Sequence, residues 1–270
     1  MIPAEPAAAL REVAGPLDEA GLAAIRASGL PVVIRGEAAH WPAVAAARRG
    51  DEAIVAYLNS WPARRPLRAI AAPPSAQGRF FYNDDLTGFN FHAANGRLEL
   101  FLADLLRARE VSPAPAMAVQ SEEIADLLPH VAAENRLAVL PGVRPRIWIG
   151  NRIRVAPHYD VKENLAVCVA GRRRFTLFPP DQIANLYPGP LELTPAGTPV
   201  SMVDHAGPRP GTLPALCEGV GGGTAGHARS GRRTLHPLLL VARGRIARSG
   251  QHPRQFLVER GHSRWCRSAL

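Results

Sequence analysis

Residues 157–182 read PHYDVKENLAVCVAGRRRFTLFPPDQ, and this stretch decides the fold. It contains two short apolar runs, 164–170 and 174–178, which a glycine at position 171 separates and a Pro-Pro pair closes. Short strands joined by tight turns are typical of a β-sandwich or a β-barrel. The stretch therefore predicts consecutive strands of such an architecture.

The same stretch begins with a His-x-Asp motif formed by His158 and Asp160. On an extended chain, side chains two residues apart point to the same face. One imidazole and one carboxylate would then project together. A second histidine from another strand would complete a 2-His-1-carboxylate triad, which binds Fe(II) and leaves coordination positions open. The motif alone is weak, because a surface pair or a hydrogen-bonded pair has the same spacing.

The wider context narrows these alternatives. The stretch is followed by Leu186-Tyr187-Pro188 and preceded by the runs 31–36 and 81–90, which read PVVIRG and FYNDDLTGFN. In this order the segments resemble the JmjC cupin-like family over about residues 25–204. Its members are Fe(II)/2-oxoglutarate-dependent oxygenases related to the asparaginyl hydroxylase of hypoxia-inducible factor. The resemblance implies a mainly β double-stranded β-helix, of the cupin or jelly-roll type, with N-terminal helices.

The resemblance also implies roles for particular residues. His158 and Asp160 stand at the positions of the first two iron ligands, and no other catalytic residue is implied. Asn164 stands where the family has a polar residue near the co-substrate. Arg173 replaces a lysine that binds the far carboxylate of 2-oxoglutarate, which an arginine can also bind. Tyr82 is a candidate for the pocket wall, although a core aromatic is an equal interpretation. The substrate would be a protein or a small molecule.

The organisation expected around the motif has three parts. We expect helices and strands that pack on the barrel in 1–140, the first part of the barrel in 141–204, and a basic tail in 205–270. Apolar spacing predicts helices at 16–27, 51–58, 98–109 and from an N-cap at Ser121 to about Ala133.

The third iron ligand is missing from this chain. The family has its second histidine in a segment like G-D-x-L-Y-I-P-x-x-W-W-H, and no such segment is present. The codons possible for Gly231–Ile246, read one base further on, permit GDALYIPSYWWHEVES. The same shift permits NILVNFWWN for Gln251–Glu259 and PDPDLERYPRF for Ala206–Leu216. We therefore hypothesise a frameshift at or just before His205, which leaves an incomplete barrel, a poorly ordered tail and an impaired enzyme.

The distribution of charge agrees with this hypothesis. The net charge of +9 and the pI of 10.6 would normally predict a polyanionic partner. However, residues 1–204 hold 21 basic and 21 acidic side chains, whereas 205–270 holds 11 arginines and two glutamates. The alternative is a non-enzymatic, degenerate cupin whose basic tail binds nucleic acid. We favour the frameshift, and so do not expect a nucleic-acid partner.

Composition excludes further classes of protein. Hydrophobic residues make up 47% of the chain, which is sufficient for a core. No apolar run is long enough to span a bilayer, and the N-terminus does not read as a secretory signal. The three cysteines are too far apart for a disulfide framework or a zinc site. We expect a cytoplasmic protein without a membrane partner, and the sequence leaves its oligomeric state open.

Overall fold

The computed structural model describes residues 10–160, 163–178, 180–204, 238–242 and 256–261. Within them lies an antiparallel sheet in the order β4-β3-β5-β6. Its strands are β3 (Leu67–Ala72), β4 (His92–Gly96), β5 (Ala116–Glu123) and β6 (Arg146–Gly150). All four come from one stretch of about eighty residues, 67–150.

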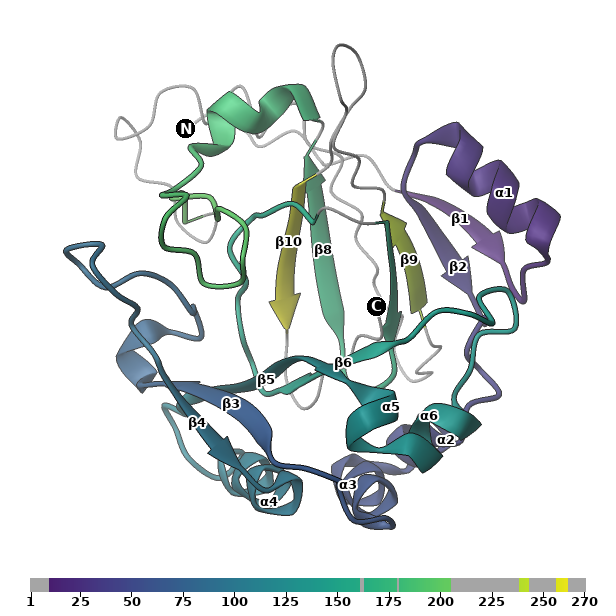
Figure 1. Ribbon diagram of the computed structural model, residues 1–270, viewed down its shortest axis with the longest axis horizontal. Coiled ribbons are helices and arrows are strands. Elements are labelled where there is room, and N and C mark those ends of the chain that lie inside the picture. The colour runs from purple at the N-terminus through teal and green to yellow at the C-terminus, as the bar shows by residue number, and fades with distance from the viewer. Residues whose placement is uncertain (1–9, 161–162, 179, 205–237, 243–255, 262–270) are drawn as a thin grey trace.

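Two further sheets lie above this one in Figure 1. The first has the order β1-β2-β9-β7, in which only the β1–β2 pair is parallel. The second pairs β10 with β8 in antiparallel fashion. Their strands are β1 (Arg11–Ala14), β2 (Val32–Arg35), β7 (Asn164–Cys168), β8 (Arg173–Phe178), β9 (Leu238–Ala242) and β10 (Phe256–Gly261).

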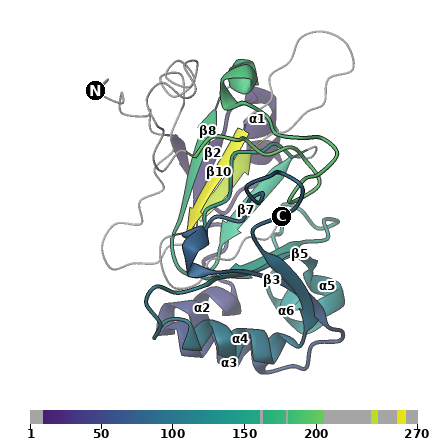
Figure 2. The ribbon, with the colours of Figure 1, turned by 90° about the vertical axis from the view of Figure 1, so that its left-hand side faces the viewer.

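Helices cover the outer face of the β4-β3-β5-β6 sheet, as Figures 1 and 2 show, while α1 lies beside β1 and β2. The helices are α1 (Glu19–Ser28), α2 (Pro42–Arg49), α3 (Asp51–Asn59), α4 (Leu98–Arg107), α5 (Ile124–Leu127) and α6 (Pro129–Glu134). Two 3-10 turns, η1 (Pro74–Ala76) and η2 (Pro180–Leu186), occur in the loops.

Apolar periodicity explains this packing. In α4, Leu98, Phe101, Leu102 and Leu105 lie on one face and are all buried. They join a core cluster that also contains residues of α2, α3, β2, β5, β6 and β7. This cluster fixes the helical layer to the sheets and therefore holds β5 and β6 in place beneath the candidate site.

Most of the predicted elements are confirmed, including the helices near 16–27, 51–58 and 98–109 and the consecutive strands expected at 164–170 and 174–178, which form β7 and β8. The predicted N-cap at Ser121 is wrong, whereas the helical character of the segment up to about Ala133 is confirmed by α5 and α6. Ser121 lies inside β5, with a φ of 55°. The helical segment starts only at Ile124 and is interrupted at Leu128, where φ and ψ of −136° and 72° precede a proline.

The region 205–270 supplies two strands. Residues 238–242 form β9 between β2 and β7. β10 pairs along the whole length of β8. The expected poor order of the rest of the tail falls outside the described residues, and the three-part division of the chain stays a prediction.

Candidate metal centre and the Arg173 hollow

His158 is held in place by its backbone. It forms an isolated antiparallel bridge with Val200, and the neighbouring Pro157 accepts a hydrogen bond from the Ser201 amide at 2.7 Å. The imidazole Nδ1 lies 2.9 Å from the carbonyl oxygen of Ala156. When Nδ1 carries the proton and donates it to that carbonyl, Nε2 is left with a lone pair. The ring is therefore oriented as a metal-ligating histidine requires.

Three of the predicted site residues are brought together here. His158 Nε2 lies 3.9 Å from Oδ1 of Asp160. The other oxygen of this carboxylate, Oδ2, accepts a short hydrogen bond from the side-chain amide of Asn164, the first residue of β7. The Asp160 side chain is 36% exposed and that of His158 14%. An imidazole nitrogen and an oriented carboxylate thus share one partly open location.

This donor set fits part of an iron site. One neutral imidazole and one carboxylate are the ligand types that non-haem Fe(II) takes, and a facial triad needs one more histidine. In the described part of the chain, no group of three or more His, Cys, Asp or Glu side chains could hold a metal ion. The five histidines of the tail, His205, His227, His236, His252 and His262, lie outside the described residues.

Arg173, the first residue of β8, lies in a different environment. It is only 6% exposed, and its guanidinium carbon is 5.5 Å from the centroid of the Phe175 ring. The buried Nη1 atom donates no hydrogen bond, although the residue has other partners. A buried guanidinium is a strong binding group for a carboxylate, because it offers paired donors and a permanent charge.

Arg173 lines a small hollow of about 10 Å³, room for about one water molecule, which is partly open to solvent. We call this space the Arg173 hollow. Its other walls come from β5, from β6 and from the loop after β6: Ala118, Val119, Gln120, Trp148, Ile149, Gly150, Asn151 and Ile153. Sequence reasoning missed these residues as site candidates. The signal available in the sequence was Trp148 between two isoleucines; only the folded sheet places it in the same hollow as Arg173 of β8.

Close packing of β5 on β6 shapes one end of the Arg173 hollow. A side chain at Gly150 would meet the Met117 carbonyl oxygen at 2.8 Å, so only glycine fits there. Asn151 continues this contact. Its Oδ1 accepts a hydrogen bond from the Met117 amide at 2.9 Å, and its Nδ2 donates one to the Pro115 carbonyl at 2.7 Å. This end of the hollow is therefore fixed by backbone and amide contacts.

Tyr82 lies elsewhere, in an apolar cluster with Ala156 and Val200. It is 4% exposed, and its hydroxyl donates to the Leu193 carbonyl at 2.8 Å. Burial raises the pKa of the Tyr82 phenol. Val200 also bridges to His158, so Tyr82 packs behind the segment that carries His158. Tyr82 is not among the residues that line the Arg173 hollow, and its role in a pocket wall stays a prediction.

Asp204 ends the main described part of the chain and is tied to the fold. Its carboxylate accepts a hydrogen bond from Nη1 of Arg154 at 3.0 Å and forms an ion pair with Nη1 of Arg79 at 3.9 Å. Arg79 stacks over the Phe81 ring at 3.5 Å and donates to the Val203 carbonyl. Burial lowers the pKa of the Arg79 guanidinium. The charge partners of Asp204, Arg79 and Arg154, therefore lie far from it in the sequence.

Comparison with known families agrees with this geometry. The chain matches the family of proteins with a cupin-like domain over residues 19–220 and belongs to that family. The predicted jelly-roll-like β fold with additional helices is thereby confirmed. No match to a curated protein was found.

None of the helices in the described ranges combines the length and the apolar character needed to cross a membrane.

Proposed function

We propose that this architecture is that of an Fe(II)/2-oxoglutarate-dependent oxygenase of the JmjC cupin-like type, related to the asparaginyl hydroxylase of hypoxia-inducible factor. The supporting observation is the approach of His158 Nε2 to Asp160 Oδ1 at 3.9 Å in a chain of the cupin-like family. In such a site, iron and 2-oxoglutarate supply the oxidising chemistry that hydroxylates a protein side chain or a small molecule.

The chain's own residues would bind and orient these groups. His158 and Asp160 would hold the metal, and the Ala156 carbonyl would accept the Nδ1 proton of the tautomer that leaves Nε2 free to bind it. Asn164 donates to the carboxylate oxygen of Asp160 and so fixes the direction of that ligand. Arg173 would bind the far carboxylate of 2-oxoglutarate through its buried guanidinium.

We further propose that the chain is frameshifted near His205 and lacks the third metal ligand. The supports are the balanced charge of residues 1–204, in contrast to the basic residues 205–270, and the pairing of Asp204 with Arg154. The segment 238–242, which forms β9, is also part of the stretch whose shifted frame permits SYWWH. The chain as written should bind Fe(II) weakly and turn over 2-oxoglutarate negligibly.

Two measurements test this proposal. The first is the nucleotide sequence across codons 195–210 and onward to the end, which must permit the three family-like segments in the shifted frame. The second is 2-oxoglutarate turnover by the purified full-length chain and by a frame-restored version. We expect activity only in the restored protein, and its loss in His158→Ala. Turnover by the chain as written, abolished by His158→Ala, would overturn the frameshift proposal.

A second candidate function rests on the 11 arginines and two glutamates of residues 205–270. A degenerate cupin with a basic tail would bind RNA or DNA without base specificity. Such binding weakens steeply with salt, because it releases counterions from the phosphate backbone. A titration of the chain with a single-stranded oligonucleotide at two salt concentrations, repeated after truncation at Asp204, distinguishes this function from the first.

A further inference from the structure

Strand β4 forms one end of the β4-β3-β5-β6 sheet, as Figure 1 shows, and within the described residues it pairs with β3 alone. In an antiparallel ladder, every second residue of such a strand points its amide and carbonyl away from its partner. The outer edge of β4 therefore offers a row of backbone donors and acceptors. Residues 92–95 are all exposed to solvent, so another chain can reach them.

β4 lacks the features that normally protect such an edge. Natural proteins place charged side chains, prolines or bulges on exposed edge strands, because these prevent pairing with another chain. β4 reads HAANG, with no charge and no proline, and its register with β3 is unbroken. The other end strands of the two four-stranded sheets are either charged, as β1 and β6 are, or mostly buried, as β7 is. Of these four strands, β4 is the one open to pairing.

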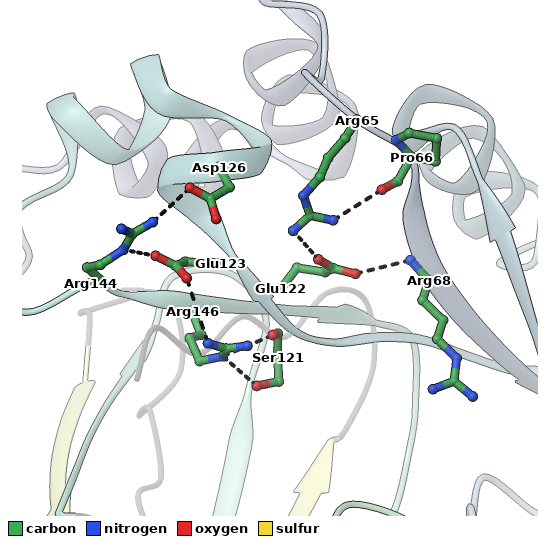
Figure 3. Close-up of polar contacts among 9 residues, drawn as sticks. All are labelled: Arg65, Pro66, Arg68, Ser121, Glu122, Glu123, Asp126, Arg144 and Arg146. Carbon is green, nitrogen blue, oxygen red and sulfur yellow. Dashed lines mark hydrogen bonds and ion pairs between the residues drawn. The ribbon is translucent and has the colours of Figure 1, made fainter.

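A positive charge lies beside this edge. Arg68 of β3 is directly opposite Asn95 of β4, so the two side chains point to the same face of the sheet. Glu122 accepts the backbone amide of Arg68 at 3.1 Å, and Figure 3 shows the guanidinium turned away from that carboxylate. Among the described residues, this exposed guanidinium has no hydrogen-bond or ion-pair partner. By contrast, Arg97, which follows β4, donates to Glu99 at 2.6 Å.

We propose that the outer edge of β4 binds an extended acidic peptide segment of another protein, which adds a strand to the sheet. Main-chain hydrogen bonds to β4 supply the affinity, as in other cases of strand addition. A peptide residue paired with Asn95 lies two strand spacings, about 10 Å, from Arg68 and on the same face. A glutamate at that position reaches the guanidinium across the short Asn95 side chain. A second copy of this chain fits less well, because its β4 has no acidic side chain to offer Arg68.

Three capped heptapeptides test this inference with the full-length chain. The first is Ser-Val-Thr-Glu-Thr-Val-Ser, whose residues favour an extended strand. The second has lysine in place of glutamate. The third keeps the glutamate but carries an N-methyl group on each backbone amide, which removes every main-chain donor. Because the basic residues 205–270 also attract an acidic peptide, this third peptide measures that background.

The readouts are the dissociation constant from isothermal titration calorimetry and hydrogen–deuterium exchange of residues 92–96. We expect the glutamate peptide to bind about fivefold more tightly than the lysine peptide, the factor that one exposed ion pair can supply. The glutamate peptide should slow exchange in β4, whereas its N-methylated form should not. Arg68→Glu should reverse the preference between glutamate and lysine. Arg11→Glu, the same charge change on the end strand β1, is the matched control and should leave the preference unchanged.

Several results would overturn the inference. Unchanged exchange of β4 with the glutamate peptide, or equal binding of its N-methylated form, would assign the binding to charge alone. Slow exchange of β4 in the free chain together with a dimer in light scattering would assign this edge to a second copy. An equal effect of Arg68→Glu and Arg11→Glu would remove the role of Arg68. None of these results bears on the proposed function, because neither metal nor 2-oxoglutarate takes part.

Discussion

The β4-β3-β5-β6 sheet and the β1-β2-β9-β7 sheet are built in different ways. The first is assembled from residues 67–150 and is covered by helices whose apolar faces are readable in the sequence. The second joins strands from both ends of the chain, and β9 is the only link between β2 and β7 that the described ladders show. A sheet made of nearby segments is robust to changes elsewhere in the chain. A sheet that needs a distant strand depends on what that part of the chain encodes.

The largest effect is expected in the helical layer. Leu102 is fully buried in α4, and Leu102→Ala should lower the free energy of unfolding by about 4 kcal/mol through lost burial and the cavity left behind. Urea denaturation of the full-length chain measures this change. Leu100, which is 56% exposed on the same helix, provides the control, since Leu100→Ala should cost little. Equal losses in both variants would contradict the assigned apolar face.

A slightly smaller effect should follow from breaking β9. Leu240 pairs with Val33 on one side and with Ala166 on the other. Leu240→Pro removes a backbone donor from a central strand and should cost about 3 kcal/mol by the same measurement. Leu240→Thr keeps the donor and serves as the control. If the proline variant is as stable as the unmodified chain, β9 does not hold the two halves of this sheet together.

A moderate effect is expected at Tyr82, where the interpretation as a core residue competes with a role in ligand binding. Tyr82→Phe removes the hydroxyl that donates to Leu193 and should lower the free energy of unfolding by about 1 kcal/mol. The dissociation constant for 2-oxoglutarate should not change. Weaker 2-oxoglutarate binding at unchanged stability would show that Tyr82 belongs to the pocket wall.

The smallest effect should be a pH dependence of the free energy of unfolding, caused by the ion pair between Glu12 of β1 and Arg35 of β2. The hydrogen bond from Arg35 lowers the pKa of the Glu12 carboxyl in the folded protein. Because its pKa is lowered on folding, the ionised Glu12 side chain stabilises the folded protein at pH values above about 4.3, the pKa of a glutamate in the unfolded chain. This contribution disappears as the pH falls through the lower pKa of the folded state. Because the side chain of Glu12 is 49% exposed, the pair should contribute only about 0.3 kcal/mol.

Unfolding measured at pH 7 and at pH 3 for Glu12→Gln and for the unmodified chain checks this effect. The free energies of unfolding of the two proteins should differ at pH 7, and the difference should shrink at pH 3. A difference that grows as the pH falls has the wrong sign and would contradict the assigned pairing.

Parts of the fold and of the site could be predicted because their signals are local. The spacing of Leu98, Phe101 and Leu105 defines a helix face without knowledge of its partner. The two-residue spacing of His158 and Asp160 was sufficient to expect their side chains together. By contrast, Ser121 followed by two glutamates reads as a helix start, but strand pairing with β6 overrides this local preference.

The sequence by itself determined three of the helices, α1, α3 and α4, the strands β7 and β8 that follow the His-x-Asp motif, and the charge contrast between residues 1–204 and the tail. These follow from periodicity, turn residues and composition, which need no information on distant contacts. Only the tertiary structure decided that Gln120 and Trp148 line a hollow with Arg173, that Asp204 meets Arg154, and that residues 238–242 lie between β2 and β7. The physical reason is that register, bulges and long-range pairing depend on which segments share a core, and no local pattern encodes that choice.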